Sequence, residues 1–218
     1  MYCSEVRSFN ISCMADLSSL AVALTGADAQ PTTAERERML DAARAEFIDH
    51  GIARTSVATI AQRAGVSRPT LYRHCGDKDQ IVAAVVQRDV IDFFTRAKVA
   101  VDAFGAVEEK VVEAVVMGLR ESREHPLVRA LRTYETDSFT ERLVDMNTPT
   151  YRAMLAIIAL MFADDQYRAP VLERALDVAL RVIATLLIAP SPYVPTDTDE
   201  NARAFADRYV VPVLRASL

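Results

Sequence analysis

The sequence predicts an all-α protein, in which an N-terminal three-helix domain is joined by a long helix to a larger helical domain. Signals that start and stop helices follow one another along the chain, and apolar residues between them recur at the spacing of one helical face. No pair of alternating segments flanks a tight turn of the kind that joins two β-strands. The 218 residues are 51 % hydrophobic and 25 % charged, which is typical of globular proteins.

The first expected helix covers about residues 33–50. Thr32 and Glu35 have the spacing of a capping box, in which the two side chains satisfy free backbone amides at a helix start. Apolar residues then recur on one face, and Gly51 offers the left-handed conformation that ends many helices. The spacing therefore predicts one helix of about four to five turns.

Two short helices follow, at about residues 57–64 and 68–75. Thr55 and Ser56 offer an N-cap for the first of them. Ser67 caps the second, with Pro69 in its first turn, where a missing amide hydrogen costs little. Both helices are therefore bounded by residues that favour their starts.

The turn between these two helices is only three residues long, Gly65-Val66-Ser67. Ala61 and Gly65 are small enough to let the helices approach closely, while Val66 fills the angle between them. This is the geometry of a helix-turn-helix unit. A plain corner between two helices of a bundle is the alternative.

A second capping box, Asp77-Lys78-Asp79-Gln80, opens a long helix that runs to about residue 103. Beyond it, a proline or an N-cap residue marks each expected boundary. The remaining expected helices cover residues 107–124, 127–133, 138–147, 149–163, 169–189 and 198–216, and Pro212 should bend or end the last of them.

Charge and cysteine content limit the partners. The chain has a net charge of −5, yet residues 51–80 carry five basic and two acidic side chains, so a polyanion should meet this stretch. Cys3, Cys13 and Cys75 lack the spacing of zinc ligands and indicate free thiols in the cytoplasm; we predict no metal and no cofactor. The longest apolar stretch, residues 153–163, is too short to span a membrane, which needs about 20 residues.

The outward end of the expected 68–75 helix carries Arg68, Thr70, Tyr72, Arg73 and His74. These side chains can donate hydrogen bonds to phosphates and to base edges in the major groove of DNA. From Ala42 to Ile81 the chain resembles the DNA-binding domain of the tetracycline-repressor (TetR) family of bacterial regulators. The resemblance is strongest in Thr55-(x)4-Ile60-Ala61-(x)2-Ala64-Gly65-Val66-Ser67-Arg68-Pro69-Thr70-Leu71-Tyr72-Arg73-His74-(x)3-Lys78.

The resemblance implies a recognition helix that presents Tyr72 and His74 to phosphates, with Lys78 holding a further phosphate. Arg68 and Arg73 are candidates for base contacts, because arginine can bond bidentately to guanine. The residues assigned to DNA binding are Thr55, Ser56, Ser67, Arg68, Pro69, Thr70, Tyr72, Arg73, His74 and Lys78. Cys75 stands where the family usually has a larger apolar residue, and it is either a small core residue or a redox-sensing thiol.

The helix from Pro170 to Ala189 is apolar nearly all round, so it must be covered on two sides. One side would pack in its own core, and the family resemblance implies that the other forms a dimer interface. The residues assigned to this interface are Leu172, Leu176, Ala179, Ile183 and Leu186. A single buried helix in a monomer is the alternative.

The resemblance also implies a cavity for a small effector among the middle helices. The candidate lining residues are Phe93, Phe94, Met117, Tyr134, Phe139, Tyr151, Met154 and Phe162. Ordinary core packing is the competing interpretation of these side chains.

We therefore expect a flexible extension at residues 1–32, a helix-turn-helix domain at 33–77 and an effector-binding and dimerisation domain at 78–218. The resulting hypothesis is a homodimeric transcriptional regulator, a repressor released from a near-palindromic operator by a small molecule; activation stays open. An enzyme is not expected, because the chain lacks a glycine-rich phosphate loop, a GxSxG elbow and an HExxH pair. The alternative is a helical ligand-binding module without DNA binding.

Overall fold

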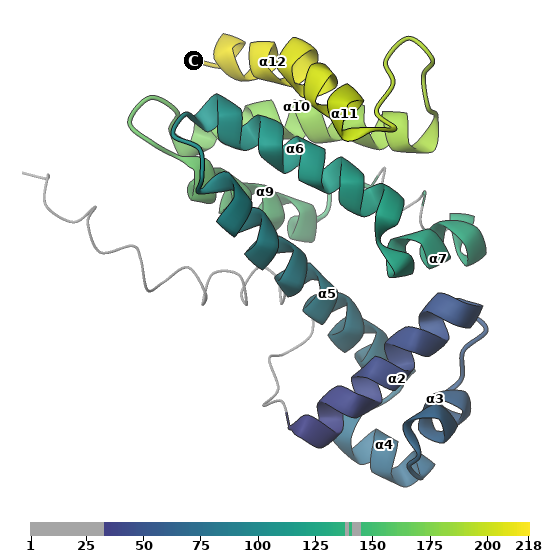
Figure 1. Ribbon diagram of the computed structural model, residues 1–218. Helices are drawn as coiled ribbons and strands as arrows, with labels where there is room; N and C mark the ends of the chain where they lie inside the picture. The colour runs from purple at the N-terminus through teal and green to yellow at the C-terminus, as the bar shows by residue number, and fades with distance from the viewer. Residues whose placement is uncertain (1–32, 138–139, 141–144) are drawn as a thin grey trace, which may run out of the picture.

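The computed structural model describes residues 33–137, 140 and 145–218, and all of its named elements are helical, as predicted (Figure 1). The described elements are α2 (Ala34–His50), α3 (Val57–Ala64), α4 (Arg68–Cys75), α5 (Lys78–Val101), α6 (Val107–Glu124), α7 (Pro126–Tyr134), α9 (Pro149–Phe162), α10 (Ala169–Ile188), α11 (Asp199–Phe205), the π-helical segment η1 (Ala206–Val210) and α12 (Val211–Ala216). The predicted extension at 1–32 lies outside the described residues.

Three boundaries differ from the prediction. The N-cap of α2 is Thr33, whose hydroxyl accepts a hydrogen bond from the Arg36 amide at 3.2 Å, one residue later than the expected cap at Thr32. The predicted helix at 138–147 lies largely outside the described residues, and 145–147 are not helical. The predicted last helix widens into a π-turn at η1 just before Pro212, whose nitrogen has no hydrogen to donate.

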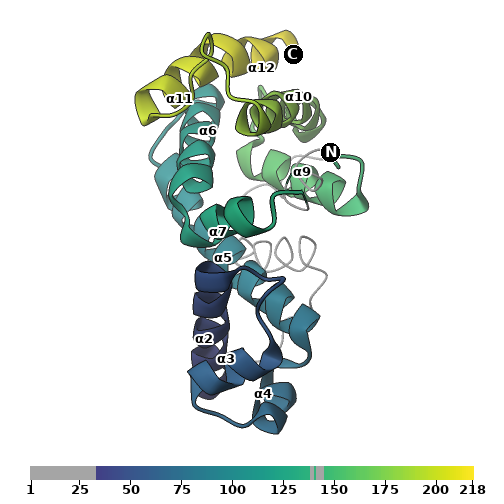
Figure 2. The same cartoon turned by 90° about the vertical axis from the view of Figure 1, so that its right-hand side faces the viewer.

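The helices form two bodies that share α5 (Figure 2). In the head, formed by α2, α3, α4 and the start of α5, Phe47, Ile60, Leu71 and Ile81 belong to one buried cluster. The second body holds the rest of α5 and the helices from α6 onward, and its core gathers side chains of α6, α9, α10 and α12. The long helix α5 is therefore a continuous connection between the two cores.

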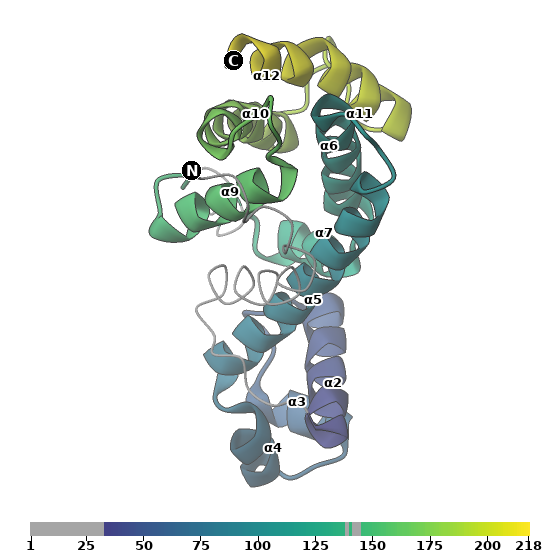
Figure 3. The ribbon, with the colours of Figure 1, turned by 90° about the vertical axis from the view of Figure 1, so that its left-hand side faces the viewer.

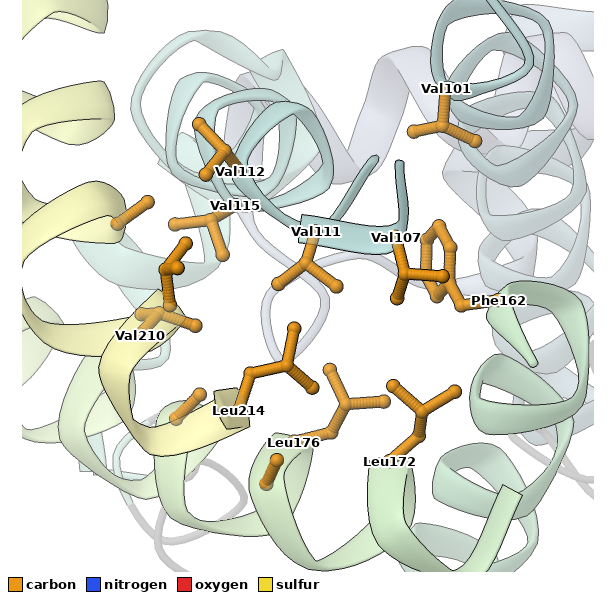
Figure 4. Close-up of a cluster of buried hydrophobic side chains, with 14 of the residues drawn as sticks. Val101, Val107, Val111, Val112, Val115, Phe162, Leu172, Leu176, Val210 and Leu214 are labelled. Atoms are coloured by element: carbon orange, nitrogen blue, oxygen red, sulfur yellow. The ribbon is translucent and has the colours of Figure 1, made fainter. Parts of the chain in front are cut away.

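The second core is built around α6. Figure 4 shows Val107 and Val111 of α6 pointing toward Leu172 and Leu176 of α10 and Leu214 of α12. In Figure 3, α10 lies between α9 and α12, with α6 along one side of the group. In this view, no helix of the described chain lies against the side of α10 that faces away from α6.

Besides α5, a contact of α7 with α2 joins the two bodies. The Tyr134 hydroxyl donates to the Asp49 carbonyl at 3.1 Å, and the Ala53 amide donates to Glu135 at 2.7 Å. Close by, Arg44 of α2 pairs with Asp89 of α5 at 2.9 Å. A displacement of α7 or α5 would therefore strain or shift the helices of the head that they contact.

Among the helices that the structure describes, none combines the length and the apolar character that crossing a membrane requires.

Candidate nucleic-acid interface and effector cavity

Local hydrogen bonds set the angle between α3 and α4. Ser56 and Thr59 form a reciprocal capping box at the start of α3, and Gly65 ends that helix in the left-handed conformation, with φ of +68°. The Ser67 hydroxyl then accepts from the Thr70 amide at 3.2 Å and starts α4. The three-residue turn that the sequence predicts is therefore present, with a cap on each side.

Burial decides which face of α4 points outward. Leu71 and Cys75 are buried against the head core, so the opposite face is exposed. That face presents Arg68, Tyr72 and Arg73, and the Tyr72 side chain is 51 % exposed. The Tyr72 ring and hydroxyl are therefore accessible to a partner that approaches this face.

The outward face of α4 is positively charged. The sequence from Val57 to Gly76 contains three arginines and no acidic residue. Arg63 is held by Asp49 at 2.7 Å and Glu46 at 2.9 Å, and these hydrogen bonds, Asp49 first, raise its pKa. Within the described part of the chain, Arg68 and Arg73 form no ion pair with a carboxylate. Both guanidinium groups are therefore available to an anionic partner.

Two further polar side chains, His74 and Lys78, border this face. The Nε2 atom of His74 lies 3.8 Å from a Glu35 carboxylate oxygen and 3.3 Å from an Arg73 nitrogen. Lys78, in the first turn of α5, donates to the Ala53 carbonyl at 3.3 Å, which places it beside the turn that precedes α3. Lys78 and the exposed start of α3 at Ser56 therefore lie on the same side of the head.

One residue assigned to DNA binding is placed elsewhere. Thr55 is buried, and its hydroxyl donates to the carbonyls of Gly51 at 2.7 Å and Glu46 at 3.3 Å. It closes the turn between α2 and α3 and cannot face a phosphate. The structure therefore does not place the Thr55 side chain at the interface, and Ser56 alone caps α3.

Sequence reasoning did not assign two arginines that lie at the head. The Nε of Arg36 donates to the His74 carbonyl at 3.1 Å and so satisfies the end of α4. Arg54 is exposed, with its guanidinium carbon 5.7 Å from the centre of the Tyr134 ring. Arg54 could have been identified because it lies in the basic stretch 51–80, whereas nothing local relates Arg36 to α4.

Cys75 packs as a core residue. Its thiol is buried 3.9 Å from the Met39 sulfur, and burial is the main reason that its pKa is raised. A thiol with a raised pKa carries little of the reactive thiolate. The geometry therefore favours a small core side chain over a redox sensor.

The second body holds a cavity of about 400 Å³ between α5, α6, α9 and α10. Five of the predicted residues line it, namely Phe93, Phe94, Tyr151, Met154 and Phe162. Met117 of α6 is not part of the lining, and Tyr134 lies at the junction with the head instead. Phe139 is outside the described residues.

The structure corrects the face of α10 that was assigned to a dimer. Leu172, Leu176 and Ala179 are buried within their own chain, and Leu186 packs against the same core. Leu176 and Ile183 also line the cavity. The outward face of α10 carries Val178 and Val182 instead, which are 45 % and 43 % exposed. Since α10 is apolar nearly all round, its composition does not distinguish the two faces.

Two short helices that cross at a capped turn, with a cationic outer face on the second, define a helix-turn-helix domain. Residues 39–85 match the family of bacterial regulatory proteins described as the tetR family. Over these residues the chain carries the tetR-family domain, as its sequence predicts. Since regulators of this family are not enzymes, the expectation of a non-enzymatic protein is also confirmed.

Curated relatives are regulators of transcription. An uncharacterized HTH-type transcriptional regulator of Mycobacterium tuberculosis is 36 % identical over 75 residues, 34 % of this chain and 40 % of that protein. The HTH-type transcriptional activator FasR of Mycolicibacterium smegmatis is 28 % identical over 71 % of this chain and 69 % of its own length. The match with the first of these relatives thus spans less than half of its length.

Solved structures share the fold across both bodies. The TetR family repressor AlkX from Dietzia, implicated in biodegradation of n-alkanes, has a TM-score of 0.57 at 19 % identity, over 84 % of this chain and 97 % of that one. The fatty acid degradation regulator FadR from Bacillus halodurans has a TM-score of 0.52 at 16 % identity, over 86 % and 96 %. At these identities the likeness concerns the fold alone.

Proposed function

We propose that the chain is a bacterial transcriptional regulator that binds a near-palindromic operator as a homodimer, represses transcription and leaves the DNA when a small molecule fills its cavity. The observation that carries the proposal is the exposed face of α4, which presents Tyr72, Arg68 and Arg73 on a helix without acidic residues. Operator DNA and a small effector are thus the proposed partners, in the cytoplasm of a bacterial cell.

The size and chemistry of α4 suit the major groove of DNA. An α-helix with its side chains is about 10 to 12 Å across, which matches the width of about 12 Å of the major groove. We assign the phosphates that border the groove to Tyr72, Lys78 and the exposed start of α3. This arrangement argues against the alternative of a ligand-binding module that has no DNA partner.

The outward face of α10 supports a dimer. Val178 and Val182 lie one helical turn apart, and both are more than two-fifths exposed. Burying such a face against a second copy would hold two heads in a fixed relation. Two heads that read half-sites about 34 Å apart explain a near-palindromic operator.

The cavity is placed to influence the head through α5. Phe93, Phe94 and Ala97 line the cavity, while Ile81 and Val85 of the same helix are buried in the head core. A ligand that prefers one position of α5 will therefore favour one position of the head. If the ligand releases the protein from DNA, transcription is repressed only without ligand. The relative FasR is an activator, so activation is the alternative for this chain. A transcription assay with and without ligand distinguishes the two.

The first test concerns the α4 face. Selecting from a pool of random DNA duplexes should enrich a near-palindrome, which then serves as the operator. Changing Tyr72 and Arg73 to alanine should weaken operator binding by roughly 10-fold to 100-fold, because a good side-chain pair with a base contributes about 1 to 3 kcal/mol. Fluorescence anisotropy of labelled operator measures the affinity.

A matched control removes a tyrosine and an arginine from the second body, with Tyr193→Ala and Arg168→Ala. Both side chains are exposed there, far along the chain from α4. The control should bind the operator like the parent protein. Equal affinity of the parent and the Tyr72 and Arg73 variant would exclude α4 as the recognition helix.

A further inference from the structure

We propose that the cavity takes a lipophilic ligand with a hydrocarbon body, an acyl or alkyl chain, and with at most one polar head group, held at the rim beside Lys98. The cavity chemistry carries this inference about ligand class. That the ligand acts as effector rests on the proposed function. The volume of about 400 Å³ lies within the range of about 300 to 1,000 Å³ common for small-molecule sites.

The cavity wall is apolar on every helix that contributes to it. Phe93 and Phe94 of α5 meet edge to face, with ring centres 5.2 Å apart, and Leu176 and Leu180 of α10 lie in the same lining. An apolar wall stabilises the apolar surface of a ligand. It provides no hydrogen-bond partners for polar groups that lose their bonds to water on binding. Sugars, nucleotides and amino acids therefore do not fit this wall.

Methionines supply a further part of the lining. Met146, Met154 and Met161 border the cavity, three of the seven methionines of the chain. Unbranched thioether side chains adapt to the shape of their neighbours at little cost. This property suits a flexible chain that takes up several conformations better than it suits one rigid ring system.

The hydroxyl of Tyr151, the phenol in the cavity lining, already has a hydrogen-bond partner. The Tyr151 hydroxyl donates to Asp177 at 3.0 Å, and Arg181 holds the same carboxylate at 2.9 Å. Hydrogen bonding to Arg181 lowers the pKa of Asp177, while burial raises the pKa of Tyr151. The phenol is thus neutral and its proton points to the carboxylate, so that it offers no free donor to a ligand.

Lys98 is the one charged residue among the described lining residues. Its ammonium nitrogen lies 2.6 Å from Asp102, and its side chain remains 31 % exposed. A partly exposed pair of this kind is weak and screened by water. A polar head of the ligand can therefore lie beside Lys98 at the rim, while its hydrocarbon body occupies the interior.

Gly118 provides a way to fill the cavity from within. It belongs to α6 and to the lining, and a Cβ atom added to it would meet no other atom within 4 Å. Gly118→Phe places a ring in the space proposed for the ligand and also removes a helix-weakening glycine. Gly105→Phe is the matched control, because Gly105 is exposed in the loop after α5 and is equally free of neighbours.

The experiment uses displacement of cis-parinaric acid, a fluorescent fatty acid, from the full-length protein. The chain contains no tryptophan, so protein emission interferes little with the probe. Saturated acids and primary alcohols of increasing length are the competitors, kept below micelle-forming concentrations. Each added methylene should tighten binding by about twofold to fourfold until the cavity is full. Affinity independent of chain length would overturn the proposal.

The variants locate the binding. Gly118→Phe should weaken competitor binding at least tenfold, whereas Gly105→Phe should bind like the parent protein. Thermal unfolding of Gly118→Phe without ligand, at or above the parent temperature, shows that the fold is intact. Undiminished binding by this folded variant would overturn the assignment to the cavity. The affinities of acids and alcohols of equal length identify the head group. If acids bind more tightly and Lys98→Met abolishes the difference, the head group is a carboxylate. Equal affinities indicate a neutral head group.

Operator retention, measured in the same samples, separates this inference from the proposed function. If acyl or alkyl ligands bind in the cavity and the protein stays on the operator, the ligand class is correct. The proposal that the ligand releases the protein from DNA is then wrong. If the protein binds the operator and no acid or alcohol displaces the probe, the ligand class is wrong. The DNA-binding assignment is not affected by that result.

Discussion

Changing both Val178 and Val182 to aspartate is expected to convert the proposed dimer to a monomer and to weaken operator binding by at least about 100-fold. Both side chains lie on the outward face of α10 and are more than two-fifths exposed in the single chain. Placing carboxylates there would bring like charges together across a two-fold axis without a counter-charge. A monomer has one head, so it loses the gain of about 100-fold to 10,000-fold that joining two heads provides.

Sedimentation velocity with and without operator measures this effect, and anisotropy supplies the affinities. Val99→Asp is the matched control, since Val99 of α5 is 72 % exposed and lies on neither α10 nor η1. The control should stay dimeric and bind the operator fully. A Val178 and Val182 variant that remains dimeric would move the interface to another face, and a monomeric parent protein would remove the dimer from the proposal.

The head was predictable because its determinants are local. Ser56, Gly65, Ser67 and Asp77 act on backbone groups within four residues, and each is found at the boundary that its residue type favours. The exposed face of α4 follows from the same helix bounds once Leu71 and Cys75 are recognised as apolar. Thr55 is the exception, because its role depends on a contact with the Glu46 carbonyl, which sequence spacing does not reveal.

The second body was less predictable because tertiary contacts decide it. The boundaries of α10 follow from proline and composition, but nothing local shows that Leu172 and Leu176 face α6 while Val178 and Val182 face outward. The same limit applies to the cavity. Tyr134 has the aromatic character of a lining residue, yet α7 turns it toward Asp49 of the head.

Replacing Gly51 with alanine is expected to lower the free energy of unfolding by about 3 kcal/mol or more. Gly51 follows α2 with φ of +81° and ψ of 160°, a backbone conformation nearly confined to glycine. An added Cβ would also lie only 2.6 Å from the Tyr134 Cβ of α7. Backbone strain and steric overlap therefore act on the same residue.

Gly65→Ala measures the cost of a positive φ without steric overlap. Gly65 also has a positive φ, +68°, but an added Cβ would meet no atom within 4 Å. Its replacement should therefore cost only the left-handed backbone strain, about 1 to 2 kcal/mol. Urea denaturation followed by far-ultraviolet circular dichroism gives both values. Equal losses would mean that α7 yields freely at Tyr134. A loss clearly above about 3 kcal/mol for Gly51→Ala exceeds what backbone strain alone costs and would show that α7 is held firmly against the head.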